Sequence, residues 1–163
     1  MSLGDMFLTV QGQRSGNIKG ESKDAKHADS IDLTGWSWGM HAGAAIGGGS
    51  TTGKTSLDSL TVTKHADSSS TALMSVMRNN ELIKKATITV RKAGTVPIDY
   101  MIVTLENARL ISYEITSVEG AASVLTERFA FSFQKITVDY YPQDGSGARK
   151  GGMSFQTEVS GGL

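Results

Sequence analysis

The segment at residues 31–40, Ile-Asp-Leu-Thr-Gly-Trp-Ser-Trp-Gly-Met, carries both tryptophans and constrains the fold more than any other stretch. Apolar residues alternate with polar or small ones, which is the two-residue period of a half-buried strand. The alternation changes register near Gly35, and this predicts a β-bulge there. Because each aromatic side chain buries roughly 150–250 Å², we expect the face of Trp36 and Trp38 to be the densest part of the core. Ser37 then points the opposite way, toward solvent, a partner subunit or a lumen.

The composition argues against several classes of protein. A length of 163 residues predicts a single domain, 1–163, that buries about 70% of the surface of its unfolded chain. There is no cysteine for a disulfide or a thiolate metal site, and 16 basic residues balance 16 acidic ones, so charge does not favour nucleic acid or an anionic membrane. No apolar run approaches the roughly 20 residues of a membrane span. The first residues lack the features of a signal peptide, so we expect synthesis in the cytoplasm and any export to occur without a cleaved leader.

Most of the remaining chain alternates in the manner of β-strands. The segment at 98–105 is apolar on both faces, which predicts a cover on its second face by a helix or a neighbouring subunit. The segment at 125–140 would be about 53 Å long if straight, and its apolar parity changes near Gln134, so we expect it to bend. The full set of predicted strands is 5–11, 31–40, 57–64, 86–91, 98–105, 110–116, 125–140 and 153–159.

One short helix is predicted within residues 67–78. Asp67 and the serines that follow it offer N-caps, and Asn79-Asn80 offers a stop. Its apolar positions fall at helical spacing and are Ala72, Leu73, Val76 and Met77. The predicted fold is therefore mainly β, a compact β-barrel of about eight strands with one short flanking α-helix.

Residues 48–55 match the phosphate-loop pattern G-x4-G-K-[ST] letter for letter. In such a loop Lys54 would reach the phosphate oxygens and Thr55 would hold Mg²⁺. That function needs a buried strand before the loop and a helix after it, whereas here a Gly- and Ala-rich loop precedes and a strand follows. The context favours a chance match, so we predict no cofactor and no enzyme activity. A nucleotide-binding enzyme is kept as an alternative.

The pentapeptide Lys-His-Ala-Asp-Ser occurs twice, at 26–30 and 64–68. A functional interpretation would pair each histidine with the aspartate as a base and its orienting group, or as metal ligands. The alternative is that Asp and Ser cap backbone amides at two loop ends. We favour capping, and predict no metal site.

Several stretches occur in an order that resembles the haemolysin-coregulated protein (Hcp) family, the tube subunit of bacterial type VI secretion systems. The resemblance covers nearly the whole chain, and Trp-Ser-Trp-Gly after Gly-Glu-Ser is its most specific combination. The stretches are Asp-Met-Phe-Leu at 5–8, Gly-Glu-Ser-Lys-Asp at 20–24 with His27, Trp-Ser-Trp-Gly at 36–39, Leu-Thr-Val-Thr-Lys at 60–64, Leu-Met at 73–74, Arg-Lys-Ala-Gly at 91–94, residues 100–105, Leu-Thr-Glu at 125–127 and Val-Asp-Tyr-Tyr-Pro-Gln at 138–143.

The resemblance implies a small β-barrel with a flanking helix that assembles as a hexameric ring. Rings stack into a hollow tube inside a contractile sheath, and firing propels tube, spike protein and effectors into a neighbouring cell. It also implies a secreted structural protein without catalysis.

With this role, function would lie in two interfaces and a lumen. We assign Ser37 to the lumen as a cargo contact. Contacts within a ring are assigned to the helix face and to the second face of the 98–105 strand, through Met101, Val103 and Leu105. Contacts between rings are assigned to the N-terminal segment and the glycine-rich loop, through Gly48, Gly49, Ser50 and Lys54. The alternative outside this family is a secreted monomeric β-barrel binding module of the adhesin type.

Overall fold

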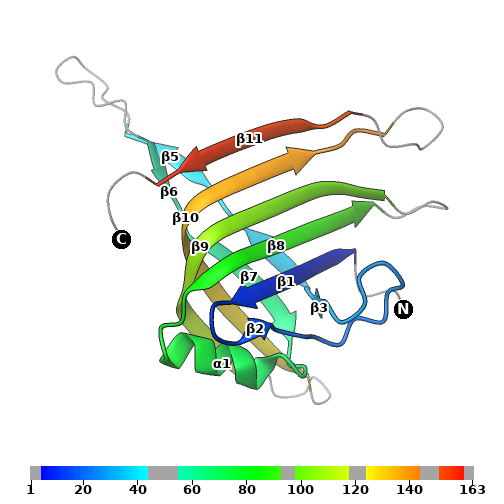
Figure 1. Cartoon of the computed structure of the whole chain (residues 1–163), viewed down its shortest axis with the longest axis vertical. Coiled ribbons are helices and arrows are strands. Elements are labelled where there is room, and N and C mark those ends of the chain that lie inside the picture. Colours follow the sequence, from blue (N-terminus) through cyan, green and yellow to red (C-terminus); the bar gives the residue numbers. More distant parts are fainter. Residues whose placement is uncertain (1–4, 44–54, 93–97, 118–123, 144–150, 160–163) are drawn as a thin grey trace.

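The structure, a computed structural model, describes residues 5–43, 55–92, 98–117, 124–143 and 151–159 (Figure 1). These residues form eleven strands and one helix. The elements are β1 (Met6–Gly12), β2 (Gly16–Asn17), β3 (Ile31–Asp32), β4 (Gly35–Ser37), β5 (Met40–Ala42), β6 (Thr55–Leu57), β7 (Leu60–His65), α1 (Ser70–Arg78), β8 (Ile83–Lys92), β9 (Ile98–Ser117), β10 (Leu125–Tyr140) and β11 (Met153–Glu158).

Nine of the described strands form one antiparallel sheet, in the order β2-β1-β8-β9-β10-β7-β4, with β3 added to β1 and β11 to β10. The β5–β6 hairpin is separate from it. The predicted mainly β class with one short helix is confirmed, but the compact barrel is corrected to a curled sheet that does not close. The physical reason is that the β1 side and the β7 side of the sheet are joined by a single crossing of the chain, between β3 and β4. There Leu33 donates its N–H to Met6 and Thr34 donates its N–H to Thr63, so the crossing replaces the predicted bulge.

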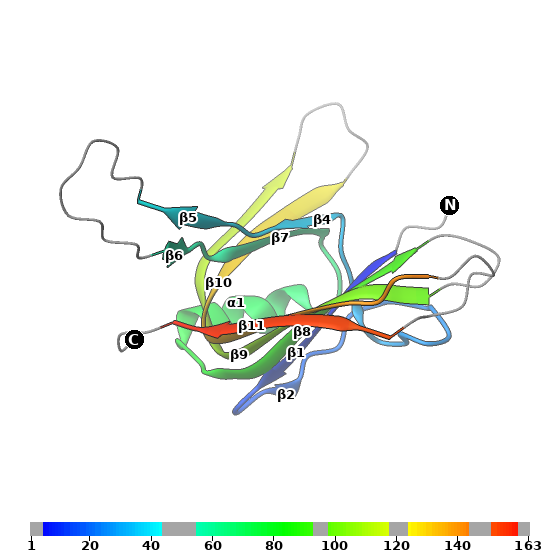
Figure 2. The ribbon, with the colours of Figure 1, turned by 90° about the horizontal axis from the view of Figure 1, so that it is seen from above.

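The long strands β9 and β10, of 20 and 16 residues, give the sheet its curl. Figure 2 shows them passing from a layer with β1, β8 and β11 into a layer with β4 and β7. The ladder between them shifts register at Ala130/Phe131, and Asn107 takes the left-handed conformation with φ 52°. The predicted bend and change of parity are confirmed, since Phe133 and Ile136 are both buried.

The core lies between the two layers and consists of aliphatic side chains and phenylalanines. Leu8, Leu60, Phe129 and Phe131 are fully buried there. Both tryptophans are only half-buried and pack against this cluster from its edge. The expectation that the tryptophan face is the densest part of the core is therefore wrong, because β4 is a three-residue strand at the end of the sheet path.

The predicted helix is confirmed as α1, which packs against β9. Leu73 and Val76 are buried, and Ala72 and Met77 pack against the core as expected from their spacing. The helix ends at Arg78, and Asn79 is its C-cap, so the predicted stop is also confirmed. Ser69 makes no side-chain cap, and the turn before the helix is instead held by the Asp67 carboxylate, which accepts from the Ser69 N–H.

Candidate functional site

A buried ion pair lies where α1 meets the sheet. The Lys64 ammonium on β7 is 2.6 Å from Glu127 Oε1 on β10, and both side chains are inaccessible to solvent. Lys64 also donates to the Asp67 carboxylate at 2.9 Å and to the carbonyl oxygen of His65 at 3.0 Å. Glu127 in turn accepts from the hydroxyl groups of Ser70 and Tyr113. The cluster therefore ties β7, β9, β10 and the first turn of α1 together.

Tyr113 is the phenol of this cluster, and its hydroxyl group donates to the Glu127 carboxylate. Burial raises the pKa of Tyr113, and the hydrogen bond to the Glu127 carboxylate raises it further because an ionised phenolate would face that charge. The phenol thus stays a hydrogen-bond donor across the physiological range. Because the Lys64 and Glu127 side chains are both inaccessible to solvent, we assign the cluster a structural role and call it a structural lock.

The two Lys-His-Ala-Asp-Ser pentapeptides have different surroundings. In the second, Asp67 accepts from Ser69, so the capping interpretation is confirmed there. In the first, His27 stacks on Phe7 with ring centroids 4.4 Å apart and places Nε2 3.2 Å from the Asp99 carboxylate. His27 pairs with an aspartate far away in sequence rather than with Asp29, so the repeat does not create two equivalent sites.

The face of the sheet that encloses the core continues onto the outer strand β11. Cross-strand neighbours form a row from Leu8 through Ile88 and Val103 to Val138 and Phe155. Exposure along it rises from 0% at Leu8, 2% at Ile88 and 1% at Val103 to 44% at Phe155. A parallel row ends at Tyr140 and Met153, which are 41% and 66% exposed. We call the four outer residues, Val138, Tyr140, Met153 and Phe155, the β11 patch.

The structure corrects part of the predicted ring contact. Val103 and Leu105 are each 1% exposed, so these two side chains are covered by the chain itself, whereas Met101 packs against the core and is only partly buried. A fully buried side chain cannot touch a second subunit. Sequence periodicity identified the residues that share a face but not what covers it, and it missed the β11 patch.

The other predicted site residues have different outcomes. Ser37 is exposed on β4 opposite Thr61, in a shallow depression of about 470 Å³ that Trp38, Met40 and Asp58 also line. Gly48, Gly49, Ser50 and Lys54 lie outside the described residues. Thr55 begins β6, which pairs antiparallel with β5, so a hairpin strand follows the phosphate-loop motif where a nucleotide site needs a helix.

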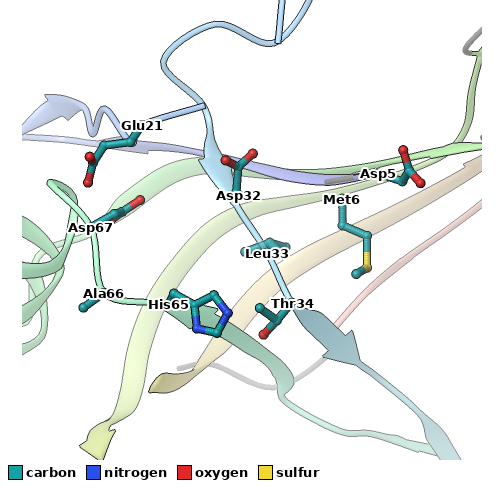
Figure 3. Close-up of a pocket in the computed structure, with 9 residues that line it drawn as sticks. All are labelled: Asp5, Met6, Glu21, Asp32, Leu33, Thr34, His65, Ala66 and Asp67. Carbon is teal, nitrogen blue, oxygen red and sulfur yellow. The ribbon is translucent and has the colours of Figure 1, made fainter. Parts of the chain in front are cut away.

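A second depression, a cavity of about 540 Å³, lies at the crossing between the two sheet edges (Figure 3). Its lining combines apolar groups with four carboxylates: Asp5, Met6, Glu21, Asp32, Leu33, Thr34, His65, Ala66 and Asp67. Burial raises the pKa of Asp32, and the neighbouring Asp67 and Asp24 carboxylates raise it too, against a lowering by the Ser22 hydroxyl. No local sequence pattern predicts this cavity, because its residues come from four separate segments.

The described residues contain neither a candidate metal cluster nor a candidate membrane-spanning helix. No group of three or more His, Asp or Glu side chains there is placed to hold a metal ion. No described helix has the length and apolar character that a membrane span requires.

Comparison with known proteins gives one consistent result. Residues 7–140 match the family model described as type VI secretion system effector, Hcp. The Hcp1 protein of Pseudomonas aeruginosa is 38% identical over 151 residues, covering 91% of this chain and 90% of that protein. The chain belongs to the Hcp family of type VI secretion proteins.

Solved structures agree in fold. A type VI secretion system effector from Yersinia pestis superposes with a TM-score of 0.75 at 25% identity, covering 94% of this chain and 99% of that one. Hcp1 from Salmonella typhimurium has a TM-score of 0.73 at 22% identity, with 94% of each chain covered. The resemblance stated from the sequence is thereby confirmed for the family and the fold.

Proposed function

We propose that this chain is a structural subunit of the type VI secretion tube. It assembles in the cytoplasm into hexameric rings that stack, carry effectors in the lumen, engage the spike protein and the contractile sheath, and leave the cell without a cleaved signal peptide. Its function is then set by the geometry of its contacts and requires no bond-making chemistry.

The observation that carries this proposal is the β11 patch. Core residues normally stop at the sheet edge, but here two apolar rows continue onto a strand whose outer edge is unpaired among the described residues. Exposed edges and contiguous apolar surface mark contacts between chains. A ring needs each subunit to present one surface to a different surface of its neighbour. We assign the first surface to the β11 patch, in place of the buried face of β9.

The magnitude of this contact is sufficient to matter. Phe155 is 44% exposed, so about 90 Å² of its surface is available. Covering that area contributes about 2 kcal/mol per subunit contact, and a closed ring repeats the contact at every boundary. Losing it should therefore disassemble rings while leaving each subunit folded.

The test is Phe155→Ser, compared with Ile115→Ser as a matched control. Ile115 is 40% exposed on β9, away from the patch. Native mass spectrometry and negative-stain microscopy should show rings for the unchanged protein and for the control, and single subunits for Phe155→Ser. A protein that stays monomeric at every concentration, without substitutions, would favour the monomeric binding module of the adhesin type.

The lumen assignment of Ser37 is a separate part of the proposal. Ser37, Ser59 and Thr61 contribute small polar groups to the depression around β4, beside the larger Trp38 and Met40, and we assign this surface to the sliding of cargo. Ser37→Gln should keep rings intact but reduce effector co-purification, and Ser112→Gln, exposed on β9, should change neither. Unchanged retention in Ser37→Gln would remove this residue from the lumen. Contacts between rings are assigned to the loop that contains Gly48, Gly49, Ser50 and Lys54.

A further inference from the structure

The cavity at the crossing of the sheet edges has an apolar floor. The floor is made by Met6, Leu33 and Ala66, and the hydrogen bond from Leu33 N–H to Met6 O fixes the first two relative to each other. A volume of about 540 Å³ is larger than one side chain needs and lies within the range of sites that hold small molecules or short peptide segments. The ring contact and the lumen proposed above use neither the floor nor the rim of this cavity.

The rim of the cavity is strongly acidic. In Figure 3 the side chains of Glu21 and Asp67 lie on one side of the 32–34 segment, and those of Asp5 and Met6 lie on the other. No Lys or Arg is among the residues that line the cavity. His65 is the one lining residue that can become positively charged.

The four carboxylates are not equally available to a ligand. Asp67 is held by Lys64 at 2.9 Å, and Asp5 is 3.9 Å from the guanidinium of Arg91. Glu21 accepts one backbone N–H, from Ser68 at 2.7 Å. Within the described part of the chain, neither Glu21 nor Asp32 forms an ion pair.

The negative charge at Asp32 therefore has no cationic partner among the described residues, and the Ser22 hydroxyl stabilises it only in part. The raised pKa of this carboxyl group is consistent with that view, since its neighbours Asp67 and Asp24 add to the effect of burial. A ligand that brings a positive charge to Asp32 and Glu21 would relieve the repulsion, and the apolar floor would accept the methylene groups that carry the charge.

We propose that this cavity is a docking site for a basic peptide segment of another protein, with an arginine or lysine side chain lying over Met6 and Leu33 and its charged end between Glu21 and Asp32. Charge complementarity selects this occupant over an acidic or purely apolar one. The long apolar stem of a basic side chain matches the floor of the cavity, and its terminal cation matches the acidic rim. This proposal goes beyond ring formation and does not depend on it.

The test uses a tripeptide probe, acetyl-Ala-Arg-Ala-amide, and its neutral isostere with citrulline in place of arginine. Binding is followed by the methyl resonance of Met6 in methionine-labelled protein, with the exposed Met74 on α1 as an internal reference. The arginine peptide should shift Met6 saturably and leave Met74 in place. The loss of two exposed ion pairs corresponds to a roughly 2- to 30-fold loss of affinity, so the citrulline peptide should bind more weakly by about that factor.

Two conservative variants separate the site from the fold. Asp32→Asn combined with Glu21→Gln keeps the shape of both side chains and the acceptor for Ser68, and should weaken binding of the arginine peptide by about 2- to 30-fold. Glu158→Gln, an exposed carboxylate on β11, is the matched control and should bind as the unchanged protein does. Raising the NaCl concentration from about 50 to about 500 mM should also weaken binding, because the rim is partly exposed.

Three results with the peptides would overturn the proposal. They are equal shifts of Met6 by the arginine and citrulline peptides, unaltered affinity in the double variant, and no saturable shift of Met6. A Met6 shift that follows the protein concentration without peptide would assign the cavity to a second copy of this chain, and would also reject it. Ring formation by the double variant in negative stain tests the tube role independently, so the two proposals fail separately.

Discussion

The buried Lys64–Glu127 pair is the interaction whose loss should change stability most. Both side chains are fully buried, and their charged atoms are 2.6 Å apart. Removing one member of a buried pair costs about 3–5 kcal/mol, because the other charge stays in the interior without its partner. Set against a typical domain stability of about 5–15 kcal/mol, this is a large fraction.

The surroundings let the two single substitutions be ranked. In Glu127→Gln, Lys64 keeps the Asp67 carboxylate at 2.9 Å, so the loss should lie near about 3 kcal/mol. In Lys64→Met, the Glu127 carboxylate keeps two hydroxyl donors and no cation within its reach among the described residues, so the loss should lie near about 4–5 kcal/mol.

The double variant gives the decisive comparison. Lys64→Met with Glu127→Gln leaves neither member of the pair charged in the interior, so its loss should be smaller than that of Lys64→Met alone and should fall below the sum of the singles by about 3 kcal/mol or more. Urea unfolding followed by fluorescence of the two half-buried tryptophans measures each free energy, at one fixed protomer concentration because assembly adds to apparent stability.

An exposed pair serves as the control for this reasoning. Lys135 lies 3.7 Å from Glu106, with the two side chains 33% and 40% exposed, so Lys135→Met should cost less than about 1 kcal/mol. If Lys64→Met costs as little as this control, or if the double variant loses the full sum of the singles, the assignment of the cluster as a structural lock is refuted.

Two further predictions concern the loops beside β1. Burial raises the pKa of Glu81, but hydrogen bonds from the Ser15 N–H, the Ser15 hydroxyl and the Arg14 N–H outweigh this and lower it. The stability contributed by Glu81 is therefore complete above about pH 4.3 and is lost as the pH falls through the lower pKa of the folded state. Glu81→Gln should make the acid unfolding curve less steep in that pH window. An unchanged slope would contradict this. A Cβ on Gly20 would lie 2.6 Å from Ser30 O and 2.7 Å from Ile31 Cα, so Gly20→Ala should lower the melting temperature and cost about 1–3 kcal/mol. Gly43→Ala, which meets nothing within 4 Å, should stay within about 0.5 kcal/mol, and equal effects of the two would refute the clash.

Elements with one apolar face were predictable from the sequence. Ala86 and Ile88 alternate with polar residues and are buried on β8, and Leu60 and Val62 are buried on β7. In each case the pattern leaves one way to place the strand against a core. The helix was predictable for the same reason, because its apolar spacing and the asparagines after it agree.

Strand β9 marks the limit of this reasoning. Its first half is apolar on both faces, so periodicity allowed either face to meet the core, and the ring contact was assigned to the face that the chain itself covers. The tryptophans were placed too deep for a related reason, because side-chain size does not show how many strands surround a short edge strand.

The candidate sites depend on contacts between residues that are far apart in the chain, and a single sequence does not show which distant residues meet. Lys64 and Glu127 are 63 residues apart, and nothing local distinguishes them from exposed charges. The cavity combines the start of β1, the 20–34 region and the turn before α1. Only the register of the sheet brings these groups together.

The two apolar rows connect folding with assembly. The inner members of the first row, Leu8, Ile88 and Val103, are buried by the same chain, and those of the second row on the same strands are partly buried, whereas the outer members on β10 and β11 remain accessible. One apolar surface is thus divided between two tasks, since the part covered by the curled sheet stabilises the subunit and the uncovered part is left for a neighbour. Substitutions at the inner end of a row should therefore lower the free energy of unfolding, and those at the outer end should impair ring formation. The change should occur at Val138, where burial by the chain's own layers ends.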